Sequence, residues 1–559
     1  MSSRVLQSHE AKTWSMAGSP VVKHVAFVVA VSVLAVVPVL LFGVPSNRDL
    51  SNHFRFALPF YDAIAGGNFY PGWLAESNGG YGDPSFRFYP PALYYLLSLF
   101  RFFTGEWYVA TLLTLVFVAV AGGLGIYFWA RTLLPSSQAM WVGLFYALAP
   151  YHLNQLYQAT MLAEWAGAGV LPFVFAFVER VCAHGRRRDV AGLAGCYALL
   201  VLTHLPLTVI GSMALVVYAF ARVDALRRLQ TLAKLAGAAA LGLCASSIYW
   251  ITMVSELRWI GINAVDHDAS VDYRFNFLLS TFSPDNMNVW WMNILLLMTL
   301  LLSAPTLTAL KKIPSLWRNA SRNQHRLRPV VVLTAFALFM ALPLSRPLWN
   351  LFSPLQQTQF PWRWLTIVSL GTAVLIAAAV PKISECARIP RMLILSAMTI
   401  AVVFTLSHVV REAKYLPRTS FENTLAAVRG TASVNYWFPI WATPTPKPMT
   451  NQVEVAGRSV TVNSWTPEAR RFSVAAGEAT TARVKTFYYP HWTATSGDQL
   501  LQTRPDKDGA LLISIPRDAA TIDLVFKEPP RSRVSSFASL AGFAFIGALA
   551  IPLQWRRKR

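Results

Sequence analysis

Long apolar runs separated by short polar stretches cover most of this 559-residue chain. The runs extend over about 17 to 25 residues, the length that a helix needs to cross a bilayer. They predict a polytopic α-helical membrane protein with about twelve spans and a membrane region over residues 25–410. The spans are expected at Val25–Val44, Trp107–Ala130, Met140–Ala149, Leu162–Val181, Val190–Thr203, Leu207–Ala221, Leu232–Val254, Val289–Leu310, Val330–Leu344, Leu365–Val380, Met392–Ser407 and, within 536–553, Phe537–Pro552.

Basic residues gather between these runs and set the expected topology. Clusters occur near Arg186 and Arg227, from Lys311 to Arg328, from Lys382 to Arg391, and at Trp555–Arg559. Because Lys and Arg in short loops remain cytoplasmic, residues 1–24 and 554–559 are expected inside and the first loop, 45–106, outside. The surplus of 49 Lys and Arg over 27 Asp and Glu follows this dispersed pattern, which does not indicate a nucleic-acid-binding face.

The apolar stretch Pro90–Phe103 is not expected to cross the membrane. It is short for a span and begins with two prolines. The positions of the basic clusters before and after it agree only if it stays on the outer side. We therefore interpret it as a re-entrant or interfacial helix that continues the first loop and forms the floor of an outward cavity.

A polar segment, residues 411–535, separates the last two spans and is large enough for one small outer domain. Its short stretches alternate apolar and polar residues, with turn residues such as Asp506–Gly509 between them, as is typical of antiparallel strands. We predict a small β-sandwich after a proline-containing linker at Ala442–Thr450. The strands are expected around Val453–Val455, Ser459–Val462, Ala482–Phe487, Leu511–Ile515 and Ile522–Phe526.

The first outer loop begins with the main candidates for chemistry. Asp49 follows the first span, where a partly desolvated acid can accept a proton from an incoming hydroxyl group. The alternative is a solvated acid or a helix N-cap paired with Arg48. His53, four residues later, would share a helical face with Asp49 and orient it, contact a sugar or join a metal site, unless it is structural. Arg55 belongs to the same cluster.

Five further residues are candidates for binding substrate. Asp83 is interpreted as a second exposed acid, in a Gly-rich turn that otherwise only shapes the loop. Glu164 begins a span on the outer side, where it either faces a ligand or favours the positive end of the helix dipole. His204 precedes a proline turn and is expected to bond to freed carbonyls. Gln359 and Arg363 lie before a span, either as an interface anchor or as a grip on phosphate.

Several short motifs together resemble known membrane proteins. The segments that carry the likeness are Arg48–His53, Gly80–Pro91, Thr203–Pro206, Gln359–Arg363 and Tyr488–Trp492. They resemble the GT-C superfamily of membrane glycosyltransferases and, more closely, a bacterial multispanning group that is labelled 6-pyruvoyl-tetrahydropterin synthase-related. The resemblance implies a GT-C-like fold. It does not imply the chemistry of the soluble synthase, because a three-histidine zinc site has no visible counterpart in the sequence.

The resemblance implies a polyprenyl-phosphate sugar donor from the bilayer and a glycan, lipid or protein acceptor on the outer side, with no nucleic-acid partner. It places the protein in a bacterial inner (plasma) membrane as a multi-pass protein with both termini cytoplasmic. By the same likeness, Asp49 matches the first-loop acid that is assigned as catalytic base. Many relatives have two adjacent acids there, whereas this chain has Arg48 before Asp49. No metal ligands are therefore assigned, and a divalent cation is neither required nor excluded.

Transfer of a sugar from a lipid phosphate passes through an oxocarbenium-like state and needs charge stabilisation of the leaving phosphate. We therefore expect Asp49 to deprotonate the acceptor, Arg363 to bind the phosphate, and His53, Arg55 and Glu164 to line or order the site. Two alternatives use the same features. A transporter or flippase of a lipid-linked saccharide would keep moving its substrate after Asp49→Asn, and a non-catalytic glycan-assembly protein would depend on its outer domain instead.

Overall fold

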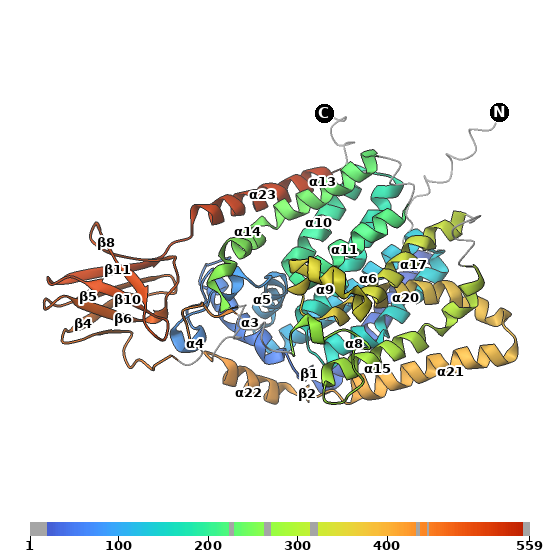
Figure 1. Cartoon of the computed structure of the whole chain (residues 1–559), viewed down its shortest axis with the longest axis horizontal. Coiled ribbons are helices and arrows are strands. Elements are labelled where there is room, and N and C mark those ends of the chain that lie inside the picture. The colour runs from blue at the N-terminus through green and yellow to red at the C-terminus, as the bar shows by residue number, and fades with distance from the viewer. Residues whose placement is uncertain are drawn as a thin grey trace.

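The computed structural model describes residues 20–222, 229–261, 270–312, 322–431, 437–443 and 446–551. A long helical region carries a β-rich domain at one end (Figure 1). The basic clusters expected near Arg227 and at Trp555–Arg559 lie outside the described residues, as do part of Lys311–Arg328 and most of the two expected cytoplasmic tails.

Helices form where the sequence has its long apolar runs, and one lies over each predicted span. A helix suits such a run because all its backbone N–H and C=O groups pair within the segment. These helices are α1 (Pro20–Leu34), α6 (Trp107–Leu133), α7 (Ser136–Ala147), α9 (Leu162–Ala183), α10 (Arg187–Thr203), α11 (Leu205–Ala221), α13 (Leu229–Ala245), α15 (Met287–Leu302), α17 (Arg322–Ala341), α20 (Leu365–Ala379), α21 (Arg388–Phe404) and α23 (Pro530–Ala550).

Not every helix is long enough to cross a bilayer alone. Within the described ranges, five helices have the required length and apolar character, or up to seven if each of two bent pairs counts as one span. One pair joins α13 to α14 (Ser247–Glu256) at 74°, and the other bends by 88° where Pro343 follows α17. The proline lacks the N–H that would continue the helix, which explains the second bend. The expected total of about twelve spans stays a prediction.

The stretch Pro90–Phe103 forms α5 (Ala92–Thr104), a helix of 13 residues. At 1.5 Å per residue its length is about 20 Å, less than the roughly 30 Å of a hydrocarbon core. Leu93, Tyr94 and Leu97 are buried on one face, whereas Phe102 and Phe103 are exposed. This amphipathic form suits an interfacial helix, and its position relative to a membrane remains a prediction.

Small residues allow the central helices to pack closely. A Cβ atom added to Gly122 of α6 would lie 3.2 Å from the Cα atom of Gly169 in α9, so the two backbones are in direct contact there. Close backbone approach at small residues is the usual mode of helix association in membranes. Together α6 and α9 form the centre of the helical region and fix the first turn of α9, which carries Glu164.

The C-terminal domain is a two-sheet antiparallel β-sandwich, as predicted. One sheet has the order β3-β6-β10-β9 and the other β4-β5-β11-β7-β8. Phe472, Val484, Phe487, Ile513 and Leu524 are buried in the core between the sheets. The fold class, a polytopic helical protein with a C-terminal β-sandwich, is therefore confirmed. The strands are β3 (Val453–Val455), β4 (Val460–Trp465), β5 (Ala469–Val474), β6 (Thr480–Phe487), β7 (Trp492–Ser496), β8 (Gln499–Leu501), β9 (Thr503–Pro505), β10 (Ala510–Ile515) and β11 (Ala520–Phe526).

A two-stranded ribbon and one helix outside the sandwich were not predicted. β1 (Val44–Pro45) pairs with β2 (Tyr415–Leu416), which joins the start of the first loop to the chain after α21. α22 (Arg418–Val428) follows β2 and packs against α3 (Leu50–Ala65), near the sandwich end of the helical region (Figure 1). These contacts bring residues 429–431 next to the first loop.

Candidate functional site

Asp49 lies at the N-cap position of α3, but its side chain does not cap the helix. Its Oδ1 accepts a hydrogen bond of 3.3 Å from Nδ2 of Asn52. Burial raises the pKa of the Asp49 carboxyl, a change that the Asn52 hydrogen bond and the positive charges of Arg363 and Arg48 oppose and the negative charge of Glu164 reinforces. Asp49, Arg363 and Glu164 therefore lie within range of one another's charge.

The simple pairing of Asp49 with Arg48 does not occur. Arg48 is exposed, and its Nη1 donates to Oδ1 of Asn288 at 2.8 Å. Across the described ranges, Oδ2 of Asp49 accepts no hydrogen bond. One carboxylate oxygen is thus available to an incoming group.

Arg363 and Glu164 form a buried ion pair between η7 (Pro361–Trp364) and the first turn of α9. Nε of Arg363 donates to Oε2 of Glu164 at 2.8 Å, and Nη1 donates to the carbonyl of Thr358. The other oxygen of Glu164, Oε1, accepts from the hydroxyl of Tyr151 at 2.8 Å and from Nε2 of Gln155 at 2.7 Å. Glu164 therefore holds Arg363 in place, and Nη2 is left without a hydrogen bond to any described residue.

His53 does not orient Asp49. It is buried, its Nε2 accepts the backbone N–H of Leu162 at 3.1 Å, and its Nδ1 lies 3.1 Å from the hydroxyl of Tyr94. Because Nε2 is an acceptor, the proton sits on Nδ1. Burial lowers the pKa of His53 to about 4, so the ring is neutral near pH 7. His53 thus satisfies the first N–H of α9, which is the structural alternative, and its ring does not bond to Asp49.

His204 and Gln359 occupy strained or terminal backbone positions. His204 is the N-cap of α11, where its Nδ1 accepts the N–H of Leu207 at 3.3 Å. The expectation that it bonds to freed carbonyls is wrong, because the free groups at a helix N-terminus are N–H donors. Gln359 adopts a φ of +66°, which is rare for residues other than glycine and sets the turn before η7. Both residues position the chain around the Arg363–Glu164 pair.

Asp83 is buried, not exposed as predicted. Its Oδ1 accepts the N–H of Ser85 at 2.6 Å and also contacts the Ser85 hydroxyl. Gly82 has a φ of +85°, and a Cβ there would overlap the ring of Trp73, so only glycine allows the loop to fold inward. Asp83 therefore shapes the loop, which is the alternative that its Gly-rich setting indicated.

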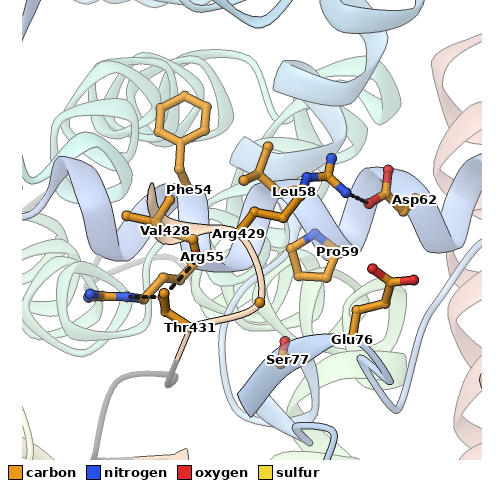
Figure 2. Close-up of a pocket in the computed structure, with 11 residues that line it drawn as sticks. Phe54, Arg55, Leu58, Pro59, Asp62, Glu76, Ser77, Val428, Arg429 and Thr431 are labelled. Carbon is orange, nitrogen blue, oxygen red and sulfur yellow. Dashed lines mark hydrogen bonds and ion pairs between the residues drawn. The ribbon is translucent and has the colours of Figure 1, made fainter. Parts of the chain in front are cut away.

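Arg55 connects Asp49 to a pocket through a residue that sequence reasoning missed, Asn52. Nη1 of Arg55 donates to Oδ1 of Asn52 at 2.8 Å, and its Nε donates to Oγ1 of Thr431 at 3.2 Å. The pocket is a shallow hollow of about 300 Å³ counted together with the open solvent at its mouth, and we call it the α3 pocket (Figure 2). It is lined by Phe54, Arg55, Leu58, Pro59, Asp62, Glu76, Ser77, Val428, Arg429, Gly430 and Thr431.

A second buried ion cluster joins the sandwich to the helices; Arg87, Tyr489 and His491 lie in the motifs Gly80–Pro91 and Tyr488–Trp492, but no sequence signal indicated that they meet at Glu256. Glu256, at the end of α14, accepts two hydrogen bonds from Arg87 of the first loop, at 2.5 and 2.8 Å. It also accepts from Tyr489 and His491 of the sandwich and from Arg531 at the start of α23. One carboxylate thus connects the first loop, the helical region and the C-terminal sandwich.

In the part of the chain that the structure describes, no group of three or more His, Cys, Asp and Glu side chains is placed to hold a metal ion. Asp49 and Glu164, the two acids nearest the expected site, are engaged with Asn52 and Arg363 respectively. The dependence on a divalent cation stays open.

Comparisons with known proteins agree with the family that the motifs resemble. No curated protein matches the sequence. Structures with a distant likeness include the arabinofuranosyltransferase AftD from Mycobacteria, at 16% identity and a TM-score of 0.46 over 71% of this chain and 27% of that one. ArnT from Cupriavidus metallidurans bound to undecaprenyl phosphate has 13% identity and a TM-score of 0.38, over 74% of this chain and 77% of that one. The Archaeoglobus fulgidus oligosaccharyltransferase has 12% identity and a TM-score of 0.43, over 76% and 61%.

Two of these structures are sugar transferases by name, an arabinofuranosyltransferase and an oligosaccharyltransferase, but TM-scores below 0.5 do not define the fold or activity of this chain. The chain spans about a quarter of the arabinofuranosyltransferase, 27% of its length. The sequence match is stronger: the model of the 6-pyruvoyl-tetrahydropterin synthase related domain, a membrane protein, matches residues 86–416. That range is more than half of the 559 residues. The chain therefore belongs to the family of 6-pyruvoyl-tetrahydropterin synthase related membrane proteins.

Proposed function

We propose that this protein is a membrane glycosyltransferase that transfers a sugar from a polyprenyl-phosphate donor to an acceptor hydroxyl on the outer side of the membrane. The observation that carries the proposal is the state of Asp49. Its carboxyl is partly buried, burial raises its pKa, and one oxygen accepts no hydrogen bond from a described residue. A carboxylate with a raised pKa is a stronger base, which suits proton removal from a sugar hydroxyl.

The positive charges around Asp49 support a phosphate leaving group. Arg363 is close enough for its charge to lower the pKa of Asp49, and its Nη2 remains available while Glu164 holds its Nε. Arg48, exposed beside Asp49, supplies a second positive charge. Arginines of this kind stabilise a departing phosphate by charge-assisted hydrogen bonds. The membership in a membrane-protein family supports a donor that arrives from the bilayer.

In the proposed reaction, the acceptor oxygen attacks the anomeric carbon of the donor while the bond from that carbon to the phosphate oxygen breaks. The hydroxyl proton passes to Asp49, and the electron pair of the broken bond leaves with the polyprenyl phosphate. Arg363 and Arg48 stabilise that anion. Glu164 and His53 are positioning residues, since Glu164 fixes the Arg363 guanidinium and His53 fixes the start of α9.

The test is release of lipid phosphate by purified protein in nanodiscs supplied with polyprenyl-phosphate pentoses and hexoses and with saccharide acceptors. Asp49→Asn should lower the rate by about 10²–10⁴-fold, the usual contribution of a general base, without changing donor binding. The control Asp498→Asn removes an exposed acid in the turn between β7 and β8 and should leave the rate unchanged. The proposal fails if neither wild type nor variant releases lipid phosphate while both move a lipid-linked saccharide across the bilayer, as a flippase would.

A further inference from the structure

A polar face of α3 connects Asp49 to the α3 pocket. Asp49, Asn52, Arg55, Pro59 and Asp62 recur at spacings of three or four residues, which places them on one side of the helix. Hydrogen bonds link the first three in order, Asn52 to Asp49 at 3.3 Å and Arg55 to Asn52 at 2.8 Å. At 1.5 Å per residue, Pro59 lies about 15 Å along the helix from Asp49. That separation is the length of a short oligosaccharide.

The charged side chains of the pocket balance one another. Arg55 and Arg429 contribute two positive charges, and Asp62 and Glu76 contribute two negative ones. Nη1 of Arg429 donates to Oδ2 of Asp62 at 2.9 Å, while Glu76 is exposed and accepts no hydrogen bond from another described residue. Figure 2 shows the two carboxylates toward one end of the pocket and Arg55 with Thr431 toward the other. A site without net charge does not select phosphate, which an uncompensated group of arginines would.

The remaining surface of the pocket is apolar and shaped by α3. Phe54, Leu58 and Pro59 form one wall, and Pro59 leaves the carbonyl of Arg55 without its usual partner within the helix. Phe54 and Leu58 are buried, so the half-buried ring of Pro59 is the apolar surface that would meet the C–H face of a sugar ring, while the acceptors and donors match its hydroxyl groups. The space of about 300 Å³ includes open solvent, so the α3 pocket is a shallow groove that one sugar unit would contact on one side.

We propose that the α3 pocket binds a neutral sugar unit of the acceptor, away from the hydroxyl that reacts at Asp49. The acceptor is then an extended saccharide, not a single small alcohol, and it lies along the polar face of α3. The part of this proposal that places the reacting hydroxyl at Asp49 rests on the proposed function. The pocket itself is a binding site that can be measured without any transfer of sugar.

Binding is tested with full-length Asp49→Asn protein in nanodiscs, titrated by calorimetry with neutral linear oligosaccharides of one to six hexose or pentose units. Glu76→Gln and Arg429→Gln, each added to Asp49→Asn, should raise the Kd of the longer oligosaccharides roughly tenfold or more, as expected for a lost hydrogen bond to a charged group. Glu422→Gln changes an exposed acid of α22 outside the pocket and should leave the Kd unchanged. Both pocket side chains are exposed, so their replacement should not unfold the protein.

The outcomes separate this inference from the proposed function. Saccharide binding that is absent, or that Glu76→Gln and Arg429→Gln leave unchanged, overturns the inference whether or not sugar is transferred. Displacement of bound oligosaccharide by inorganic phosphate at a lower concentration than by any monosaccharide overturns it as well. Binding that both variants weaken, with no transfer by the wild-type chain, supports the pocket and overturns the glycosyltransferase. With transfer present, the variants should raise KM for long acceptors, while kcat and the KM of a monosaccharide acceptor stay the same.

Discussion

The ion cluster around Glu256 makes the attachment of the sandwich depend on one buried negative charge. Glu256 is fully buried and accepts hydrogen bonds from Arg87, Tyr489, His491 and Arg531. Glu256→Gln keeps the shape of the side chain but removes the charge and replaces one acceptor oxygen by an N–H group. The arginine partners of Glu256 can only donate, so they lose both their counter-charge and one acceptor oxygen.

The expected loss of stability in Glu256→Gln depends on the buried charge of Arg87 that remains. Arg87 is 1% exposed and keeps only Glu528 as an anionic partner, at 2.5 Å. The side chain of Glu528 is 38% exposed, so solvent screens part of its compensation. Removing one partner of a buried ion pair costs about 3–5 kcal/mol because the remaining charge stays buried. We expect the free energy of unfolding to fall by about 3 kcal/mol, the lower end of that range, since Glu528 still pairs with Arg87.

The assay is denaturant unfolding of the nanodisc-bound protein, followed by tryptophan fluorescence. The chain has 19 tryptophans, so the signal follows unfolding of the whole protein; one of them, Trp259, lies beside the cluster, with the guanidinium of Arg531 5.7 Å from its ring centroid. The control Asp523→Asn removes the partner of Arg471 in an exposed pair on the sandwich and should not shift the unfolding midpoint. A Glu256→Gln protein with the wild-type midpoint would refute the conclusion that this cluster holds the sandwich to the helices.

Three further predictions concern single side chains. Because burial raises the pKa of Asp49, the rate of sugar transfer should increase with pH through that raised value and then level off, and a flat profile from about pH 4 to 8 would exclude the base role. Burial lowers the pKa of His53 from 6.5 to about 4, so as the pH falls the unfolded chain takes up a proton before the folded chain does. The free energy of unfolding should therefore fall as the pH drops from 6.5 towards 4. His53→Gln should weaken this pH dependence when unfolding is measured across that range. Arg470 lies between the rings of Trp465 and Trp492, and its Nε and Nη2 have no hydrogen-bond partner in the described chain. Arg470→Met should therefore keep the free energy of unfolding within about 1 kcal/mol of wild type or raise it. A loss above about 3 kcal/mol would contradict this prediction.

The helices and most strands could be predicted because their signals are local. An apolar run predicts a helix from its own residues, and the alternation in Leu511–Ile515 predicts a strand in the same way. β5 was missed because Arg470, a charged residue, occupies an inward position and interrupts the alternation. The pairing of β1 with β2 could not be predicted, since Val44 and Leu416 are far apart in the sequence and each strand has only two residues.

The site was predictable in its members but not in its pairings. Asp49, Glu164 and Arg363 were all candidates, but the bond between Glu164 and Arg363 joins residues 199 positions apart and has no local signal. Asn52 could have been found, because it lies three residues from both Asp49 and Arg55 on one helical face. The burial of Asp83 follows from contacts of its loop with the sandwich that only the folded chain shows.

The geometry of Arg363 also bears on when Asp49 would act as a base. Arg363 and Glu164 shift the pKa of Asp49 in opposite directions, so their ion pair partly cancels its own effect and burial remains the largest cause of the increase. A donor phosphate bound at Nη2 of Arg363 would add negative charge near Asp49 without breaking the bond from Nε to Glu164. Added negative charge raises the pKa of a carboxyl group further. Binding of the donor should therefore strengthen the base, so that proton removal from the acceptor is favoured only once the lipid phosphate is in place.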